Sequence, residues 1–149
     1  MSIEELSPQE VHERLNTEEG AVYLDVRTEQ EFRQGHPAGA LNIPIFHLDA
    51  YTGQPQPNPE FMQVVEANVS KELPVYVGCA SGQRSSQAAS ILRRDGYQRV
   101  VNVDGGFTGK RDHLGNLIAP GWQDLSLPTE SDDGGDRAYN ALRGKVAAS

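Results

Sequence analysis

The sequence predicts an α/β fold, a single domain with a mostly parallel central sheet and helices on both faces. Short apolar runs at residues 21–26, 73–77 and 100–103 have the length of buried strands. Segments with helical spacing separate these runs, and strands that alternate with helices build parallel sheets. A length of 149 residues suits one domain with its own core.

Capping residues and periodicity indicate the elements in order. Ser7 and Thr28 each stand three residues before a glutamate, which is the capping-box signature of a helix start. Gly96 suits a helix end. The expected elements are a helix at 7–15, a strand at 21–26, a short helix at 28–33, a turn at 35–39, a strand at 41–43, a loop at 49–58, a helix capped by Asn58 and running to 69, a strand at 73–77, a helix at 85–95 and a strand at 100–103.

The chain after residue 106 departs from this alternation. Residues 108–121 combine turn-forming residues with short apolar pieces, which is typical of a hairpin, here inserted beside the sheet edge. An acidic linker and a terminal helix follow, with Tyr139, Leu142 and Val146 on the docking face of the helix. We therefore expect a main domain at 1–128 and a tail at 129–149.

Composition restricts the class of function. The chain has 13 basic and 21 acidic residues, a formal net charge of −8, whereas nucleic-acid partners require basic surfaces. No apolar run reaches the roughly 20 residues of a membrane span, and the acidic start lacks signal-peptide features. We expect a cytoplasmic protein without nucleic-acid or membrane partners. One cysteine and four scattered histidines predict no metal site and no cofactor.

The most informative segment surrounds the single cysteine, Cys79. It follows the apolar run 73–77 and precedes a helix, so it lies at the carboxyl edge of the sheet, where α/β proteins bind ligands. Backbone N–H groups of the small-residue loop and the helix dipole would favour the nucleophilic thiolate. Arg84, five positions later, adds fixed positive charge. The alternative interpretation is a buried structural cysteine.

Three ordered motifs resemble the rhodanese family. They are the segment from Leu24 to Pro44, the loop from Cys79 to Ser85, and the double glycine Gly105-Gly106. The resemblance spans about residues 5–128 and implies a single rhodanese-like domain. It also implies sulfur transfer, in which Cys79 takes sulfane sulfur from thiosulfate or a persulfide donor. The resulting persulfide would pass its sulfur to cyanide, a small thiol or a thiol protein.

The expected site residues fall into three groups. Cys79 is the expected nucleophile. Substrate contacts are expected from its loop, from one strand end and from the hairpin, namely Ala80, Ser81, Gly82, Gln83, Arg84, Ser85, Arg27, Lys110 and Arg111. Asp25, Glu31 and His36 are expected to support the loops. Lys110 and Arg111 would form a lip that attracts anions, unless the hairpin carries only ordinary surface charges.

Two other functions remain open within this resemblance. Related phosphatases and arsenate reductases use a cysteine loop one residue longer, so the five-position step to Arg84 favours sulfur transfer. Non-catalytic rhodanese-like binding modules often lack the cysteine that this chain retains. Because the chain has no second cysteine, a persulfide on Cys79 has no internal thiol to resolve it and must be discharged to another molecule.

Overall fold

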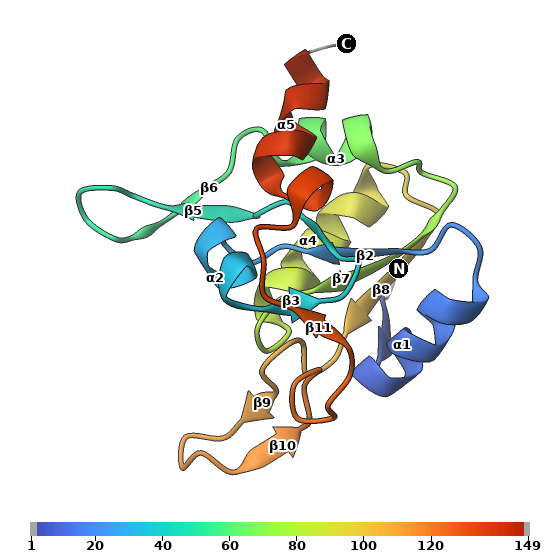
Figure 1. Cartoon of the computed structure of the whole chain (residues 1–149), viewed down its shortest axis with the longest axis vertical. Coiled ribbons are helices and arrows are strands. Elements are labelled where there is room, and N and C mark those ends of the chain that lie inside the picture. The colour runs from blue at the N-terminus through green and yellow to red at the C-terminus, as the bar shows by residue number, and fades with distance from the viewer. Residues whose placement is uncertain (1–2, 148–149) are drawn as a thin grey trace.

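Five parallel strands form the central sheet, in the order β1-β8-β7-β2-β4. The computed structural model describes residues 3–147. Its central strands are Glu4–Leu6 (β1), Val22–Asp25 (β2), Leu41–Asn42 (β4), Pro74–Gly78 (β7) and Arg99–Val103 (β8) (Figure 1). The expected α/β class and parallel sheet are confirmed.

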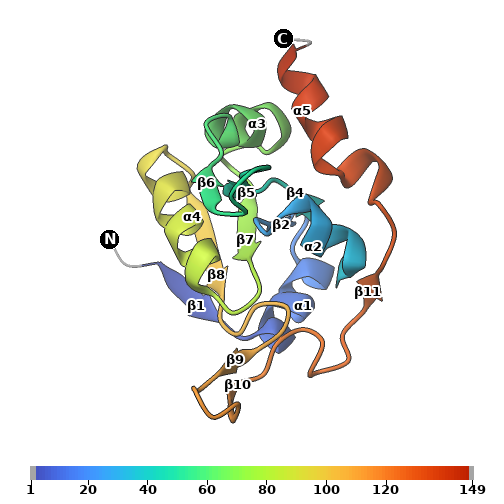
Figure 2. The ribbon, with the colours of Figure 1, turned by 90° about the vertical axis from the view of Figure 1, so that its left-hand side faces the viewer.

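Helices cover both faces of this sheet (Figure 2). One face carries α1 (Pro8–Thr17) and α2 (Glu29–Gln34), and the other carries α3 (Phe61–Asn68) and α4 (Gln83–Arg94). The strands alternate between two buried clusters because successive strand side chains point to opposite faces. On β7, Tyr76 joins the cluster under α1 and α2, while Val75 and Val77 join the cluster under α3 and α4.

The helix starts that matter for the site follow local capping chemistry. Thr28 and Glu31 form the expected capping box, so α2 begins directly after β2 and its short connection. The helix α4 begins at Gln83, two residues earlier than expected, because Gly82 takes the cap position at φ +120°. Only glycine adopts such a backbone conformation without strain. Arg84 therefore belongs to the first turn of α4.

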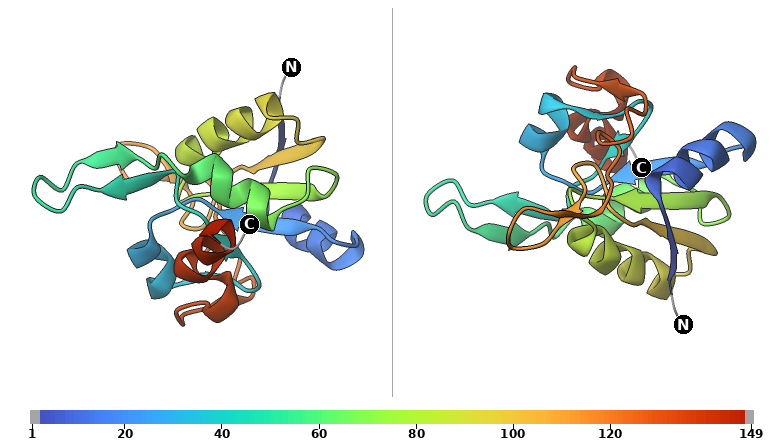
Figure 3. Two further views of the ribbon diagram at one scale, coloured as in Figure 1. Left: turned by 90° about the horizontal axis from the view of Figure 1, so that it is seen from above. Right: turned by 90° about the horizontal axis from the view of Figure 1, so that it is seen from below.

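The structure corrects the expected loop at residues 49–58. Phe46–Leu48 (β5) and Pro55–Pro57 (β6) form an antiparallel hairpin that projects from the body (Figures 1 and 3). Prolines argue against a central strand, but a two-stranded ribbon has open edges that tolerate them. The next helix begins at Phe61 instead of directly after an Asn58 cap, because the Asn58 side chain accepts a hydrogen bond from the Glu60 N–H and closes a turn first.

The segment after residue 106 contains the expected hairpin and terminal helix. Lys110–Arg111 (β9) pairs with Leu117–Ala119 (β10) in a second projecting hairpin (Figure 1). Thr129–Glu130 (β11) then pairs antiparallel with His36–Pro37 (β3), which was not expected from the sequence. Two-residue strands are too short for a periodic signal.

The tail packs on the main core. After the short 3-10 helix Gly135–Arg137 (η1), α5 (Tyr139–Ala147) buries Tyr139 and Leu142 in the same cluster as α3 and α4. The Asn68 side-chain amide donates to the carbonyl of Leu142 at 2.9 Å, and Figure 1 shows α5 beside α3. Among the described residues, none of the helices combines the length and apolar character needed to cross a membrane.

Candidate active site

Cys79 directly follows β7 at the carboxyl edge of the sheet and precedes α4. Its side chain is 2% exposed, and Sγ accepts a hydrogen bond from the Gly82 N–H at 3.1 Å. The short loop thus curls so that a backbone donor points at the sulfur. Hydrogen bonds to a charged acceptor are stronger than those to a neutral one, so this donor stabilises a thiolate more than a thiol.

The turn after β8 holds the cysteine loop from behind. The Phe107 N–H donates to the carbonyl of Cys79 at 2.8 Å, and the Thr108 N–H donates to the carbonyl of Ala80 at 2.9 Å. Gly106 permits this contact because it has φ +56°, and a Cβ there would lie 2.4 Å from the Cys79 carbonyl oxygen. The double glycine therefore sets the distance between the two loops.

Arg84, in the first turn of α4, is paired with Glu31 of α2. Its guanidinium donates to both Glu31 carboxylate oxygens, at 2.7 and 3.0 Å. Burial opposes ionisation of Glu31, but the hydrogen bonds and charge of Arg84, together with donors from Thr28, outweigh it and lower the pKa of Glu31 to about 2. Glu31 therefore both caps α2 and fixes the orientation of Arg84.

Arg27 and Asp25 form a buried ion pair next to Phe107, in the turn that follows β8. The Arg27 Nη2 lies 2.8 Å from Asp25 Oδ2 and also donates to the Gly35 carbonyl at 2.7 Å. The guanidinium stacks over the Phe107 ring, 4.4 Å from its centroid. Arg27 and Phe107 line a cavity of about 230 Å³ together with Glu31. Arg27 thus faces this cavity while its charge is compensated.

Every cation that we expected at the site has a carboxylate partner. The closest nitrogen–oxygen distances in these pairs are 2.8 Å for Arg27–Asp25, 2.7 Å for Arg84–Glu31, 3.1 Å for Lys110–Asp104 and 3.0 Å for Arg111–Asp124. The positive side-chain charge is therefore largely balanced. An anion near the sulfur would therefore be attracted more by the backbone N–H groups of the loop and of the α4 start than by free cations.

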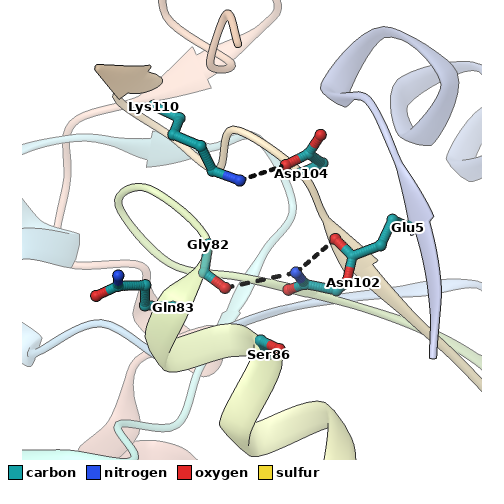
Figure 4. A pocket seen from close by; sticks show the side chains of 7 residues that line it. All are labelled: Glu5, Gly82, Gln83, Ser86, Asn102, Asp104 and Lys110. Atoms are coloured by element: carbon teal, nitrogen blue, oxygen red, sulfur yellow. Dashed lines mark hydrogen bonds and ion pairs between the residues drawn. The ribbon is translucent and has the colours of Figure 1, made fainter. Parts of the chain in front are cut away.

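A second cavity, of about 670 Å³, lies on the side of the loop that faces β8 and the β9–β10 hairpin (Figure 4). Gly82 and Gln83 line it from the start of α4, and Lys110 reaches it from the hairpin. The Arg111 side chain is instead engaged with Asp124 and the Thr108 carbonyl. The hairpin thus brings Lys110 to the loop, and Arg111 braces the hairpin base.

The remaining expected loop residues differ in what their side chains can reach. Ala80 and Ser81 are half-buried and Gln83 is exposed. Ser85 is fully buried, and its Oγ donates to Asn102 Oδ1 at 2.6 Å. Ser85 therefore braces the loop against β8, with its side chain already engaged.

Asn102 and Thr108 also support the cysteine loop, although neither was expected from the sequence. Asn102 is buried, accepts from Ser85, and donates to Glu5 at 2.8 Å, which links β8 to β1 and to α4. The Thr108 Oγ1 adds a second donor to the Ala80 carbonyl at 2.9 Å. A polar residue inside the apolar run 100–103 was the available signal for Asn102, since buried polar groups need partners.

His36 lies on β3, fully buried, with its ring stacked on Phe32 at a centroid distance of 3.6 Å. Its Nδ1 lies 2.6 Å from the Phe32 carbonyl oxygen at the end of α2. Its Nε2 faces Glu130 and Asp132 of the tail. The ring therefore connects α2 to the tail through contacts that do not involve the cysteine.

The fold and the site together indicate one class of protein. It is an α/β domain with a cysteine in a tight strand-to-helix loop, and a double-glycine turn packs against this loop. A family model described as the rhodanese-like domain matches residues 7–112. The chain therefore belongs to the rhodanese-like family. The motifs that predicted this family from the sequence are the ones that build the cysteine loop and its support.

Similar proteins indicate which activities occur among relatives of this chain. The chain is 38% identical over 112 residues to thiosulfate sulfurtransferase 16, chloroplastic, of Arabidopsis thaliana, covering 75% of this chain and 82% of the relative. It is 40% identical over 90 residues to the Arabidopsis protein HIGH ARSENIC CONTENT 1, mitochondrial, covering 60% of this chain and 52% of that protein. The crystal structure of Rv0390 from M. tuberculosis superposes with a TM-score of 0.72 at 28% identity, covering 88% and 99% of the two chains. The relatives named as sulfurtransferases support that class of activity.

Replacing Gly106 by alanine tests the contact between the two loops. The added Cβ would meet the Cys79 carbonyl oxygen at 2.4 Å, so the turn must shift. We expect the free energy of unfolding to fall by about 1–3 kcal/mol from backbone strain alone, with a further loss from the clash. Urea denaturation measures the change.

Gly115 provides a matched control, because it also has positive φ (+87°) but nothing within 4 Å of an added Cβ. Gly115→Ala should show the strain cost without the clash. Equal destabilisation of the two variants would contradict the proposed role of Gly106.

Replacing Glu31 by glutamine tests the electrostatic part of the Arg84 contact. The amide oxygen of glutamine can still cap α2, but the charge is lost. Because the folded pKa of Glu31 is lowered from 4.5 to about 2, its charge stabilises the fold fully above about pH 4.5, and this contribution is lost as the pH falls toward 2. We expect wild type to exceed Glu31→Gln in unfolding free energy near neutral pH and the difference to shrink in acid.

The control for this comparison is Glu29→Gln, which removes a carboxylate from the same turn of α2. Its difference from wild type should change less over the same acid range. A Glu31→Gln difference that stays constant from neutral pH down to about pH 2 would exclude the charge of Glu31 as the stabilising feature.

Proposed function

We propose that the chain is a thiosulfate sulfurtransferase that carries sulfur as a persulfide on Cys79. The observation that carries the proposal is the hydrogen bond from the Gly82 N–H to Cys79 Sγ, in a loop fixed from behind by Phe107 and Thr108. A sulfur that accepts a backbone donor at a helix start is suited to hold negative charge. The sulfurtransferase names of relatives point to the same chemistry.

In the first step, the Cys79 thiolate attacks the outer sulfur of thiosulfate. A new sulfur–sulfur bond forms, the bond between the two sulfurs of thiosulfate breaks, and sulfite leaves with the bonding electron pair. Negative charge moves from Cys79 Sγ to the outer sulfur of the persulfide and to sulfite. Preorganised N–H donors favour such a step because they need no rearrangement as the charge develops.

In the second step, a thiolate or cyanide attacks the outer sulfur of the persulfide. The bond between this sulfur and Sγ breaks, and Sγ recovers the electron pair as a thiolate. The chain has one cysteine, so this attack comes from another molecule. The nearly complete burial of Cys79 (2% exposed) favours acceptors with a narrow reactive end.

The second candidate is a reaction on an oxyanion such as arsenate, which the name of the arsenic-related relative suggests. The short step from Cys79 to Arg84 argues against it, because α4 begins at Gln83 and leaves few residues to surround a tetrahedral ion. Turnover of an aryl phosphate or of arsenate distinguishes the two candidates.

Mass spectrometry of the intact chain tests the central step. Incubation with thiosulfate should add the mass of one sulfur atom, and cyanide should remove it with formation of thiocyanate. Cys79→Ser should show neither event. Wild-type chain in urea keeps the thiol but loses the loop, so it should not take up sulfur.

Unmodified wild-type protein that hydrolyses an aryl phosphate or reduces arsenate would favour the oxyanion candidate. Unmodified protein with neither activity would favour a binding module. Sulfur uptake that persists in urea would mean that the loop contributes nothing to the reaction.

The Lys110 side chain tests the proposed role of the hairpin as a lip. Lys110 lines the cavity beside Gly82, so Lys110→Ala should raise KM for thiosulfate with little change in kcat. A roughly two- to fivefold rise corresponds to the about 0.5–1 kcal/mol of an exposed charge. The effect should decrease as salt increases, because salt screens exposed charges.

Arg111→Ala is the matched control, because Arg111 carries the same charge and, like Lys110, is paired with a carboxylate, but it does not line this cavity. It should raise KM less than Lys110→Ala does. Identical KM values for the wild type and both variants at every salt concentration would exclude the lip.

A further inference from the structure

The imidazole of His36 faces two carboxylates at a place separate from the cysteine loop. Its Nε2 lies 3.5 Å from Glu130 Oε1 and 3.7 Å from Asp132 Oδ1. The His36 side chain is fully buried, and within residues 3–147 Nε2 finds no hydrogen-bond partner. A buried polar atom without a partner is costly in a native fold and calls for an explanation.

The other ring nitrogen determines what Nε2 can offer. Nδ1 lies 2.6 Å from the Phe32 carbonyl oxygen, which can only accept, so Nδ1 must carry a proton. In the neutral ring, Nε2 then presents a lone pair toward Glu130 and Asp132. A lone pair that faces two carboxylates is favourable only when a positive charge lies between them.

The spacing of the three groups suits a metal ion. One ligand atom from each of His36, Glu130 and Asp132 can be chosen so that all three lie within 4.8 Å of one another. Zinc binds imidazole and carboxylate ligands at about 2.0–2.2 Å, which places tetrahedral ligands about 3.3–3.5 Å apart. The distances of 3.5 and 3.7 Å from Nε2 to the two oxygens are close to this separation.

The surroundings of the cluster are also compatible with a divalent cation. The Phe32 carbonyl orients the ring through Nδ1, which is the usual outer-shell contact of a metal-bound histidine. Arg137 donates to Glu130 Oε1 at 2.7 Å, and the Gly39 N–H donates to the same oxygen at 3.2 Å. Glu130, Asp132 and Arg137 sum to a charge of −1, so a divalent cation leaves the cluster only singly charged. The Asp132 side chain is exposed, which leaves room for a solvent ligand.

We propose that His36, Glu130 and Asp132 bind a divalent transition-metal ion of the zinc type. Imidazole combined with carboxylates is a donor set that suits this class of ion. The ion would fasten the tail to β3 and to the end of α2, next to the β3–β11 pairing. This role is independent of the sulfur chemistry at Cys79.

Zinc titration of the full chain tests the proposal. The titration uses the Cys79→Ser chain as its background, because a free thiolate also binds zinc. Calorimetry and equilibrium dialysis should give one zinc per chain, and zinc should raise the melting temperature relative to the same chain in EDTA. Asp132→Asn keeps an acceptor for the Gly134 N–H but removes the ligand charge, so it should weaken binding at least about tenfold.

Asp133→Asn is the matched control, since it removes one charge from the same acidic segment, and the Asp133 side chain accepts a hydrogen bond from the Gly135 N–H instead of facing His36. It should keep both the stoichiometry and the rise in melting temperature. Equal zinc affinities of the two variants would overturn the proposal and point to the other histidines. Absence of zinc binding, or binding without any rise in melting temperature, would also overturn it and favour a protonated His36 that pairs directly with the carboxylates.

Discussion

The position of Cys79 depends on the contact between the loops that follow two neighbouring strands, β7 and β8. The Phe107 and Thr108 N–H groups hold the carbonyls of Cys79 and Ala80, so the cysteine loop cannot relax into an ordinary strand-to-helix turn. Gly106 allows this approach, because no side chain fits between the two backbones. With its carbonyls held on one side, the loop directs the Gly82 N–H toward the sulfur. The backbone environment of the sulfur is therefore fixed by the loops that follow these neighbouring strands.

Backbone N–H groups also determine the electrostatic potential around the sulfur, because the nearby arginines are paired with carboxylates. Arg27 and Arg84, which the sequence suggested as anion contacts, are paired with Asp25 and Glu31. A paired arginine is a weak attractor of anions, but it is well oriented, and orientation lowers the entropy cost of a contact. Backbone N–H groups cannot be neutralised by a carboxylate elsewhere in the chain. Their positive potential therefore persists whatever the ionisation of the surrounding side chains.

Much of this arrangement was predictable, because it depends on local signals. The capping box at Thr28, the strand before Cys79 and the double glycine at Gly105 are short patterns with one favoured structure. The sequence did not predict β1, the β5–β6 hairpin or the pairing of β11 with β3. These strands have two or three residues, and they form through long-range partners rather than through propensity. The compensation of Arg84 by Glu31 was hidden for a related reason, since the capping box alone explained that glutamate.

The tail lies outside the family match, but through His36 it contacts α2, the helix that carries Glu31. The helix α2 has only six residues, too few to be stable by itself. Its first turn is held by Thr28 and Glu31, and at its end the Phe32 carbonyl accepts the His36 Nδ1–H. Carbonyls at a helix end lack partners within the helix, so this contact stabilises the last turn. Glu31 orients Arg84 from the same helix. A positive charge bound between His36 and the tail would therefore stabilise the platform on which Arg84 is held, without approaching the sulfur.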